Sequence, residues 1–207
     1  MKNIFRVVAA LSLSIWSCGS MPTPGTDGGT DAGNNMGTDA GADAGPTAPT
    51  CASYCSTVMA NCTGANKQYP NEAACLGSCS ALPQGTTGAT SGNSLSCRAY
   101  HADAAPTDAT LHCPHAGPAG DGACGGNCES FCTIAVAKCS SEFADVNACT
   151  TACSGFAMNT AHYTDATTSG NSFACRMYHL SVAATDAASA TAHCPHTTTA
   201  SAPGACQ

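Results

Sequence analysis

The sequence contains few of the residues that build an ordinary hydrophobic core. Leu, Ile, Val and Phe together account for 21 of the 207 residues, and only 14 of these lie beyond position 15. So low a content is typical of chains that stay disordered. Charged residues are also scarce, at 9%, and aromatic residues make up 5%. Any folded part of this chain therefore needs covalent cross-links in addition to apolar burial.

The sequence also lacks the short motifs of common catalytic and cofactor sites. It has no nucleophile elbow, no phosphate-binding loop and no metalloprotease helix motif. It contains no Cys-x-x-Cys pair, which excludes the usual redox pair and the covalent haem motif. We therefore expect a protein that is not an enzyme.

Basic residues are too few for a nucleic-acid-binding surface. Residues 51–207 hold nine acidic and four basic side chains, and the whole chain has a formal net charge of −7. A net negative domain repels phosphate backbones and anionic lipid headgroups. Nucleic acid is therefore not expected as a partner.

Cysteine, in contrast, is abundant and repeats in order. Eight cysteines between positions 51 and 124 are answered by eight between 128 and 206, with insertions and deletions confined to the segments between them. Local matches confirm the register, since Cys97 to His101 corresponds to Cys175 to His179 and the His-Cys-Pro-His motif occurs at 112–115 and 193–196. The sequence therefore predicts two copies of one module, at residues 51–126 and 127–207.

The cysteines are expected to form four disulfides in each module. At about 2–4 kcal/mol each, four bonds contribute about 8–16 kcal/mol, which matches the stability of a typical domain. Disulfides persist in oxidising compartments, so we expect an exported protein.

The first residues have the features of an export signal. Lys2 and Arg6 precede an apolar run that is too short to span a membrane, and residues 1–17 are predicted to be a signal peptide. The following Ile15-Trp16-Ser17-Cys18 resembles the lipobox of bacterial lipoprotein precursors, apart from Trp16, where a small or aliphatic residue is usual. The resemblance implies that Cys18 is lipidated, with palmitate among its acyl chains, and that the protein is membrane-anchored. Because Gly19, and not Asp, follows, it also implies sorting to the outer membrane.

Parity supports this role for Cys18, because the two modules use 16 of the 17 cysteines. The alternative is a reactive thiol or a bridge to another chain. Residues 18–50 are rich in Gly, Asp, Thr, Ala and Pro and have no apolar periodicity, so we expect a flexible tether, spanning about 30 Å.

The spacing of the first five cysteines in each module predicts a helical hairpin. Cys51, Cys55, Val58, Met59 and Cys62 lie on one helix face, and Thr50 is a suitable N-cap. The corresponding helix of the second module is expected to begin at the cap Asn127. Second helices, capped by Asn71 and Asp145, carry Cys75 and Cys79, and Cys149 and Cys153.

When two disulfides join a pair of antiparallel helices, both bonded cysteine pairs must have the same midpoint in the sequence, that is, the same sum of residue numbers. This condition predicts the bonds Cys51 to Cys79, Cys55 to Cys75, Cys128 to Cys153 and Cys132 to Cys149. The spacing is similar to that of the twin Cys-x-x-x-Cys hairpins of small chaperones found between the mitochondrial membranes. Beyond this similarity, the modules match no named family. The fold class expected is mainly α, with two tandem small helical disulfide-rich domains after a disordered tether.

A third helix is expected to start near Asn93 or Ser94 and to carry Cys97, Arg98 and His101. We expect Arg98 and its counterpart Arg176 to form salt bridges or to cap loop carbonyls. The remaining cysteines of each module allow three connectivities that spacing does not decide. These are Cys62, Cys97, Cys113 and Cys124 in the first module and Cys139, Cys175, Cys194 and Cys206 in the second.

Six of the seven histidines recur at matched positions, and His162 stands alone. The recurrent residues are His101, His112 and His115, and His179, His193 and His196. Three imidazoles in each module are suitable ligands for zinc or copper. The alternative is that they are structural, packed among disulfides and hydrogen-bonded to the backbone. The function expected is therefore a membrane-tethered lipoprotein with a binding or structural role at the cell surface, and the alternative is a metal-binding lipoprotein.

Overall fold

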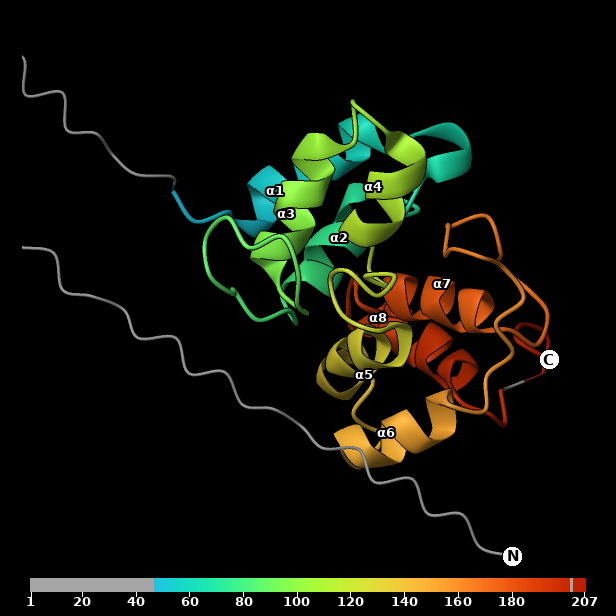
Figure 1. Ribbon diagram of the computed structural model, residues 1–207. Helices are drawn as coiled ribbons and strands as arrows, with labels where there is room; N and C mark the ends of the chain where they lie inside the picture. The colour runs from blue at the N-terminus through green and yellow to red at the C-terminus, as the bar shows by residue number, and fades with distance from the viewer. Residues whose placement is uncertain (1–46, 202) are drawn as a thin grey trace, which may run out of the picture. The chain divides into compact units, whose positions relative to one another are not determined.

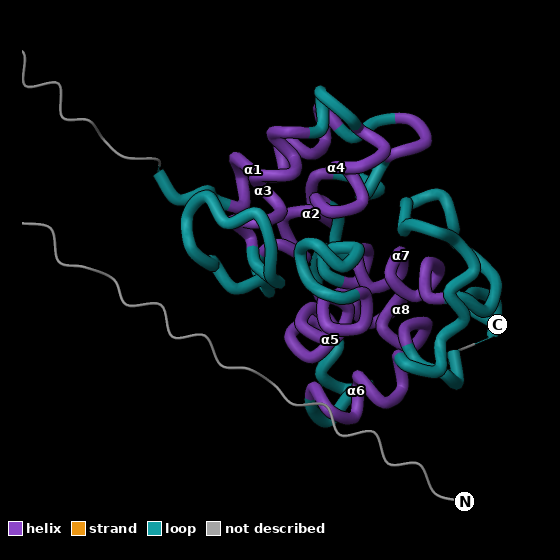
Figure 2. Tube along the Cα trace, viewed as in Figure 1, coloured by secondary structure: helices purple, strands orange, loops and turns teal. Residues whose placement is uncertain are grey.

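The computed structural model of the protein describes residues 47–201 and 203–207. This part of the chain consists of helices, two 3-10 turns and loops, and it contains no β-strand (Figure 2). None of its helices is long and apolar enough to cross a membrane. The predicted mainly helical, disulfide-rich fold is confirmed. The predictions for the signal peptide and for Cys18, and most of the tether, lie outside the described residues.

Each module contains four α-helices (Figure 1). The first module has α1 (Cys51–Asn61), α2 (Glu72–Cys79), α3 (Leu95–Ala104) and α4 (Ala109–Ala116), with the 3-10 turn η1 (Gly64–Asn66) after α1. The second has α5 (Asn127–Lys138), α6 (Val146–Cys153), α7 (Phe173–Ala183) and α8 (Ala187–His193), followed by the 3-10 turn η2 (Cys194–Thr197).

Most of the helices begin at the expected caps. At each of these caps, a side-chain oxygen accepts a hydrogen bond from the backbone N–H three residues further on. The capping residues include Thr50, Asn71, Ser94, Asp145 and Ser172. Asn127 is an exception, because it is the first helical residue of α5 and Gly126 occupies the cap position. The Glu129 carboxylate accepts the N–H of Gly126 at 3.1 Å, so the exposed N–H is satisfied from inside the helix.

Two helices were not expected from the sequence. Asp108 caps α4 and Asp186 caps α8, by accepting the N–H of Leu111 at 3.1 Å and of Ser189 at 2.8 Å. The first His-Cys-Pro-His motif lies entirely within α4, and α8 ends at the first residue of the second motif. Pro114 therefore lies inside α4, whereas α8 ends before Pro195 and the chain continues as η2.

Eight disulfides hold the helices together. The hairpin α1–α2 is closed by Cys51–Cys79 and Cys55–Cys75. The hairpin α5–α6 is closed by Cys128–Cys153 and Cys132–Cys149, so these four bonds are the ones that the shared midpoints predict. The pairings left open by spacing are equivalent in the two modules: Cys62–Cys113, Cys97–Cys124, Cys139–Cys194 and Cys175–Cys206.

The modules pack against each other, and the described residues form one compact unit. Each module has its own buried core, but Leu82 and Ala119 of the first module belong to the core of the second. Helix α2 contacts α7 directly. An ion pair between Lys67 and Asp165, 3.0 Å apart, also links the two modules.

Candidate metal centre

In the first module, two packed helices bring three histidines together. His101 lies on α3, one turn after Cys97, and His112 and His115 lie three residues apart on one face of α4. The disulfide Cys62–Cys113 fixes α4 to the end of α1, between these two histidines in sequence. Each of the three offers one ring nitrogen, and the three nitrogens all lie within 4.8 Å of one another. We call this set the first histidine triad.

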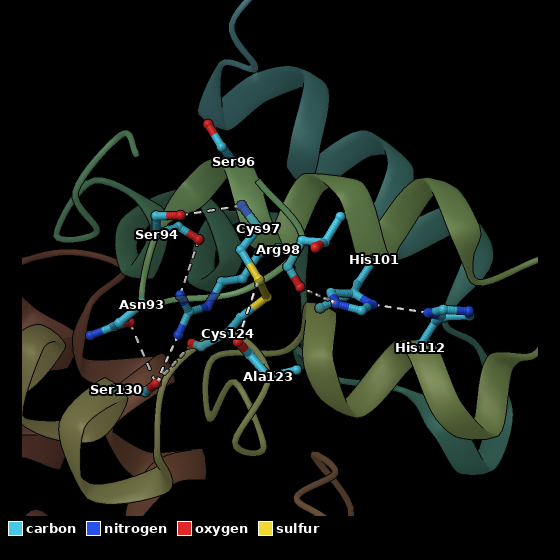
Figure 3. Close-up of a disulfide and its surroundings, with 12 residues drawn as sticks. Asn93, Ser94, Ser96, Cys97, Arg98, His101, His112, Ala123, Cys124 and Ser130 are labelled. Atoms are coloured by element: carbon cyan, nitrogen blue, oxygen red, sulfur yellow. Dashed lines mark hydrogen bonds between the residues drawn. A yellow bond between two sulfur atoms is a disulfide. The ribbon is translucent and has the colours of Figure 1, made fainter. Parts of the chain in front are cut away.

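A backbone carbonyl determines the tautomer of His101. Its Nε2 lies 3.2 Å from the carbonyl oxygen of Thr90, and because a carbonyl only accepts, Nε2 carries the hydrogen. The neutral ring therefore has its lone pair on Nδ1, which lies 2.9 Å from Nδ1 of His112 (Figure 3). Metal-ligating histidines commonly donate their second ring N–H to a carbonyl in this way.

His115 supplies the third nitrogen-bearing ring. Its ring centre is 4.7 Å from that of His101. Its Nδ1 is buried and has no hydrogen-bond partner. A buried polar atom without a partner is costly, and a bound ligand removes that cost. This nitrogen of His115 is therefore available to a ligand.

The second module repeats the arrangement only in part, since among the described residues its three histidines do not form a group whose ring nitrogens all lie within 4.8 Å of one another. In the second histidine triad, His179 Nε2 donates to the carbonyl of Thr168 at 3.2 Å, and its Nδ1 lies 2.8 Å from Nδ1 of His193. His196 also has a buried Nδ1 without a partner. Its ring centre is 4.8 Å from that of His179 and 6.3 Å from that of His193. This wider spacing arises because His193 ends α8 whereas His196 lies on η2.

Burial keeps several of these rings neutral. Desolvation lowers the pKa of His101 and His179, and the hydrogen bonds to the carbonyls of Thr90 and Thr168 offset this only in part. Desolvation also lowers the pKa of His115 and of His193. A neutral imidazole is the form that binds a metal ion, so the surroundings favour coordination at neutral pH.

His162 does not join either triad. Its Nδ1 lies 2.6 Å from the Asp121 carboxylate, so this histidine of the second module pairs with a turn of the first. The negative charge of Asp121 raises the pKa of His115, opposing the larger effect of burial. At the position equivalent to Asp121, three residues before the last cysteine, the second module has Pro203. The two histidine triads therefore differ in their electrostatic surroundings.

The paired arginines cap loop carbonyls, which is one of the two roles expected for them. Arg98 donates to the carbonyls of Ser94, Gly117 and Pro118. Arg176 donates to those of Ser172, Thr198 and Cys206. These bonds hold the segment that follows each His-Cys-Pro-His motif. The sequence signal for the oriented histidines was the repeated Thr-Ser-Gly-Asn-Ser before α3 and α7, whose first carbonyl accepts the histidine N–H.

Comparisons with known proteins give a partial match. Residues 35–128 match the BfoA family C-terminal domain, which covers the first module and somewhat less than half of the chain. A protein of Aspergillus niger called Aurasperone B biosynthesis cluster protein A is 47% identical over 64 residues, or 30% of this chain and 21% of the relative. Bifonsecin B biosynthesis cluster protein A of Aspergillus brasiliensis is 44% identical over 64 residues, 30% of this chain and 22% of the relative.

The chain thus spans about a fifth of the length of the curated relatives it matches. No solved structure matches the chain significantly. The family match and the disulfides together support a cysteine-rich domain outside the well-known families. The names of the relatives refer to biosynthesis clusters and give no reaction.

Proposed function

We propose that this chain is an exported, non-catalytic metal-binding protein in which each histidine triad holds one zinc or copper ion. The observation that carries the proposal is the orientation of His101 and His179. In both modules a carbonyl takes the N–H of the ring and leaves the Nδ1 lone pair directed at a second histidine. Without an ion, Nδ1–H of the second histidine donates to this lone pair, and a bound ion would replace that hydrogen bond.

The distances fit nitrogen ligands around one small ion. Two nitrogens that bind zinc at about 2.0–2.1 Å in a tetrahedral site lie about 3.3 Å apart. The Nδ1 pairs are 2.9 Å and 2.8 Å apart, so the rings need to separate by only a few tenths of an ångström. Three histidines leave the fourth position open to water or to a ligand from a partner.

An open fourth position suits a protein that accepts an ion and passes it on. The expected non-catalytic binding role is compatible with the names of the relatives, which place them in biosynthesis clusters without assigning a reaction. The paired modules give the chain one such centre each.

Calorimetric titration of zinc and of copper into the oxidised protein at about pH 7.5 tests the proposal. We expect one ion per histidine triad, and the double variant His112→Ala, His115→Ala is expected to lose the site of the first module only. As the pH falls below about 6.5, protonation of the imidazoles competes with the ion. Because burial lowers the pKa of His101 and His115, their contribution to affinity is lost below about pH 6.5.

The matched control is His162→Ala, which removes a histidine outside both triads and leaves the stoichiometry unchanged. Circular dichroism at each pH shows that the fold is retained. Binding no tighter than about millimolar in the wild type would overturn the proposal and leave the histidines as structural residues.

We further propose that the protein is tethered to the outer membrane through lipidated Cys18. The lipobox-like sequence and the use of the other 16 cysteines in eight disulfides support this. Wild-type protein is expected in the membrane fraction and Cys18→Ala in the soluble fraction, with Ser20→Ala as the control that stays membrane-bound. If intact-mass spectrometry finds wild-type protein that carries no lipid and begins at a residue other than Cys18, the proposal of lipidation is wrong.

A further inference from the structure

A disulfide lies beside His101, on the side of the ring away from His112. Figure 3 shows His101 between the Cys97–Cys124 bond and His112. The two sulfur atoms and one nitrogen of His101 all lie within 4.8 Å of one another. Cys97 and His101 are one helical turn apart on α3, so the helix itself fixes their proximity.

The second module has the same cluster, made of Cys175, His179 and Cys206. All of these cysteines are buried, and both histidines are less than a tenth exposed. Among the described residues, such three-ligand groups do not form around the hairpin disulfides of either module. The arrangement is therefore specific to the bond that joins the third helix of a module to its last cysteine.

We propose that each of these two disulfides conceals a redox-gated metal site, which a dithiol opens by reducing the bond. While the bond is intact, its sulfur atoms are poor ligands. After reduction, two cysteine sulfurs and one imidazole form a Cys₂His donor set that binds zinc or copper(I). For this, the ring proton that Nε2 donates to the carbonyl of Thr90 or Thr168 moves to Nδ1, so that the nitrogen on the disulfide side gains a lone pair. A set of this composition, with an open fourth position, is an established zinc environment.

Reduction of the disulfide by the dithiol is a two-electron step. The dithiol attacks the S–S bond, is itself oxidised to a disulfide, and supplies two electrons and two protons. The S–S bond breaks and two S–H bonds form. Binding of the ion then displaces both thiol protons to solvent, because the thiolate is the ligand.

Hydrogen bonds keep the two sulfurs together after the covalent bond is broken. In the first module, the Cys124 N–H donates to the carbonyl of Gly120 at 2.8 Å, and the Gly92 N–H donates to the carbonyl of Ala123 at 2.9 Å. Arg98 holds the start of the same segment through the carbonyl of Gly117. None of these bonds involves the sulfur atoms, so reduction leaves the segment beside α3.

The second module is held in an equivalent way. Arg176 donates directly to the carbonyl of Cys206 at 3.2 Å, and the Gly170 N–H donates to the carbonyl of Ala205 at 3.0 Å. Each buried arginine thus preorganises a reduced site. The inference extends the proposed metal function but does not depend on it, because the Cys₂His set needs neither His112 nor His193.

Differential thiol labelling of the full chain tests this inference. The protein is reduced without oxygen by increasing amounts of a phosphine, which is oxidised to its oxide with water and does not compete for zinc as a dithiol does. Exposed thiols are alkylated with and without zinc, and a second label of different mass follows denaturation and chelation. Peptide mapping then reports the state of each cysteine.

We expect zinc to protect Cys97, Cys124, Cys175 and Cys206 from the first label by at least tenfold, about the loss typical when a metal site is impaired. The thiols of the opened Cys51–Cys79 and Cys128–Cys153 bonds are expected to react equally with and without zinc. Cobalt(II) in place of zinc is expected to give a thiolate charge-transfer band in the near ultraviolet.

Two double variants separate this site from the histidine triads. His101→Ala with His179→Ala is expected to abolish the zinc protection. His112→Ala with His193→Ala damages only the triads and is expected to retain it. Equal labelling of all reduced cysteines with and without zinc, whether through unfolding or through absence of binding, would overturn the inference. Protection that persists in the His101→Ala, His179→Ala variant would overturn it as well.

Discussion

Replacing Arg98 with methionine is expected to lower the free energy of unfolding by about 3–5 kcal/mol. The side chain of Arg98 is completely buried, and no acidic side chain of residues 47–201 or 203–207 lies within hydrogen-bonding distance of it. Its guanidinium instead donates to three backbone carbonyls and, at 2.9 Å, to the Ser130 hydroxyl of the second module. Burial lowers its pKa from the usual value of arginine.

Methionine fills a similar volume but donates no hydrogen bond. The carbonyl of Pro118 would be left without this donor, and that of Gly117 would keep only the N–H of Gly120 at 3.2 Å. Leaving a buried acceptor unsatisfied costs about 1–3 kcal/mol. Arg98→Met also removes the cost of burying a charge, which offsets part of the cost of the unsatisfied carbonyls. The net loss in the free energy of unfolding is therefore well below the sum of the four lost hydrogen bonds.

Urea denaturation followed by circular dichroism measures the effect. A loss of about 3 kcal/mol corresponds to a fall in melting temperature of about 6–12 °C for a chain of this size. Arg98→Lys keeps the charge but not the fork of donors, and it should give an intermediate loss. Lys138→Met is the control, because Lys138 donates to the exposed Ser80 hydroxyl, and a change within about 0.5 kcal/mol is expected. A loss below about 1 kcal/mol for Arg98→Met would show that these carbonyls find other donors.

Substitution of Gly77 by alanine is expected to destabilise the contact between the modules by about 2–3 kcal/mol. Gly77 lies on α2, where that helix meets α7. A Cβ atom at Gly77 would overlap the carbonyl oxygen and carbon of Ala184, where ordinary contact begins at 3.4 Å. Both of these atoms belong to the backbone, so the two helices must move apart.

In an isolated helix the same change would stabilise by about 1 kcal/mol, because alanine has the higher helix propensity. The sign of the measured effect therefore reports on the packing of the modules. We expect the single unfolding transition to broaden or split, since each module retains its own disulfides. Gly155→Ala is the matched control, because its Cβ would meet only the carbonyl oxygen of Ala152 at 3.5 Å. An unchanged or raised melting temperature for Gly77→Ala would show that α2 and α7 are not in close contact in solution.

The sequence was most informative where cysteines lie on helices. The Cys-x-x-x-Cys spacing fixes which face of α1 and α2 carries sulfur, so Cys51 and Cys55 have only one antiparallel arrangement with Cys75 and Cys79. Spacing could not pair Cys97 with Cys124, because a loop and a further helix separate them and loop length imposes little constraint. The helices α4 and α8 were missed because the proline of the His-Cys-Pro-His motif is typical of a break.

The site was predicted in composition but not in geometry. Recurrence of six histidines identified the two triads as candidates, and it gave no information on the direction of each ring. That direction depends on the carbonyls of Thr90 and Thr168. The repeated Thr-Ser-Gly-Asn-Ser marks this segment, but it does not show which backbone atom meets the histidine ring. The packing of one module on the other was also not predicted, since a single glycine among 21 does not reveal a helix contact.

The close approach of α7 to Gly77 has no counterpart at the equivalent position of the second module. The residue at the equivalent position of the second module is Thr151, which is exposed on α6, as are its neighbours Thr150 and Val146. A threonine there blocks the docking of a further helix in the way that α7 docks on α2. The two modules therefore differ at this face, since α2 packs against a helix of the neighbouring module whereas the corresponding residues of α6 are exposed to solvent.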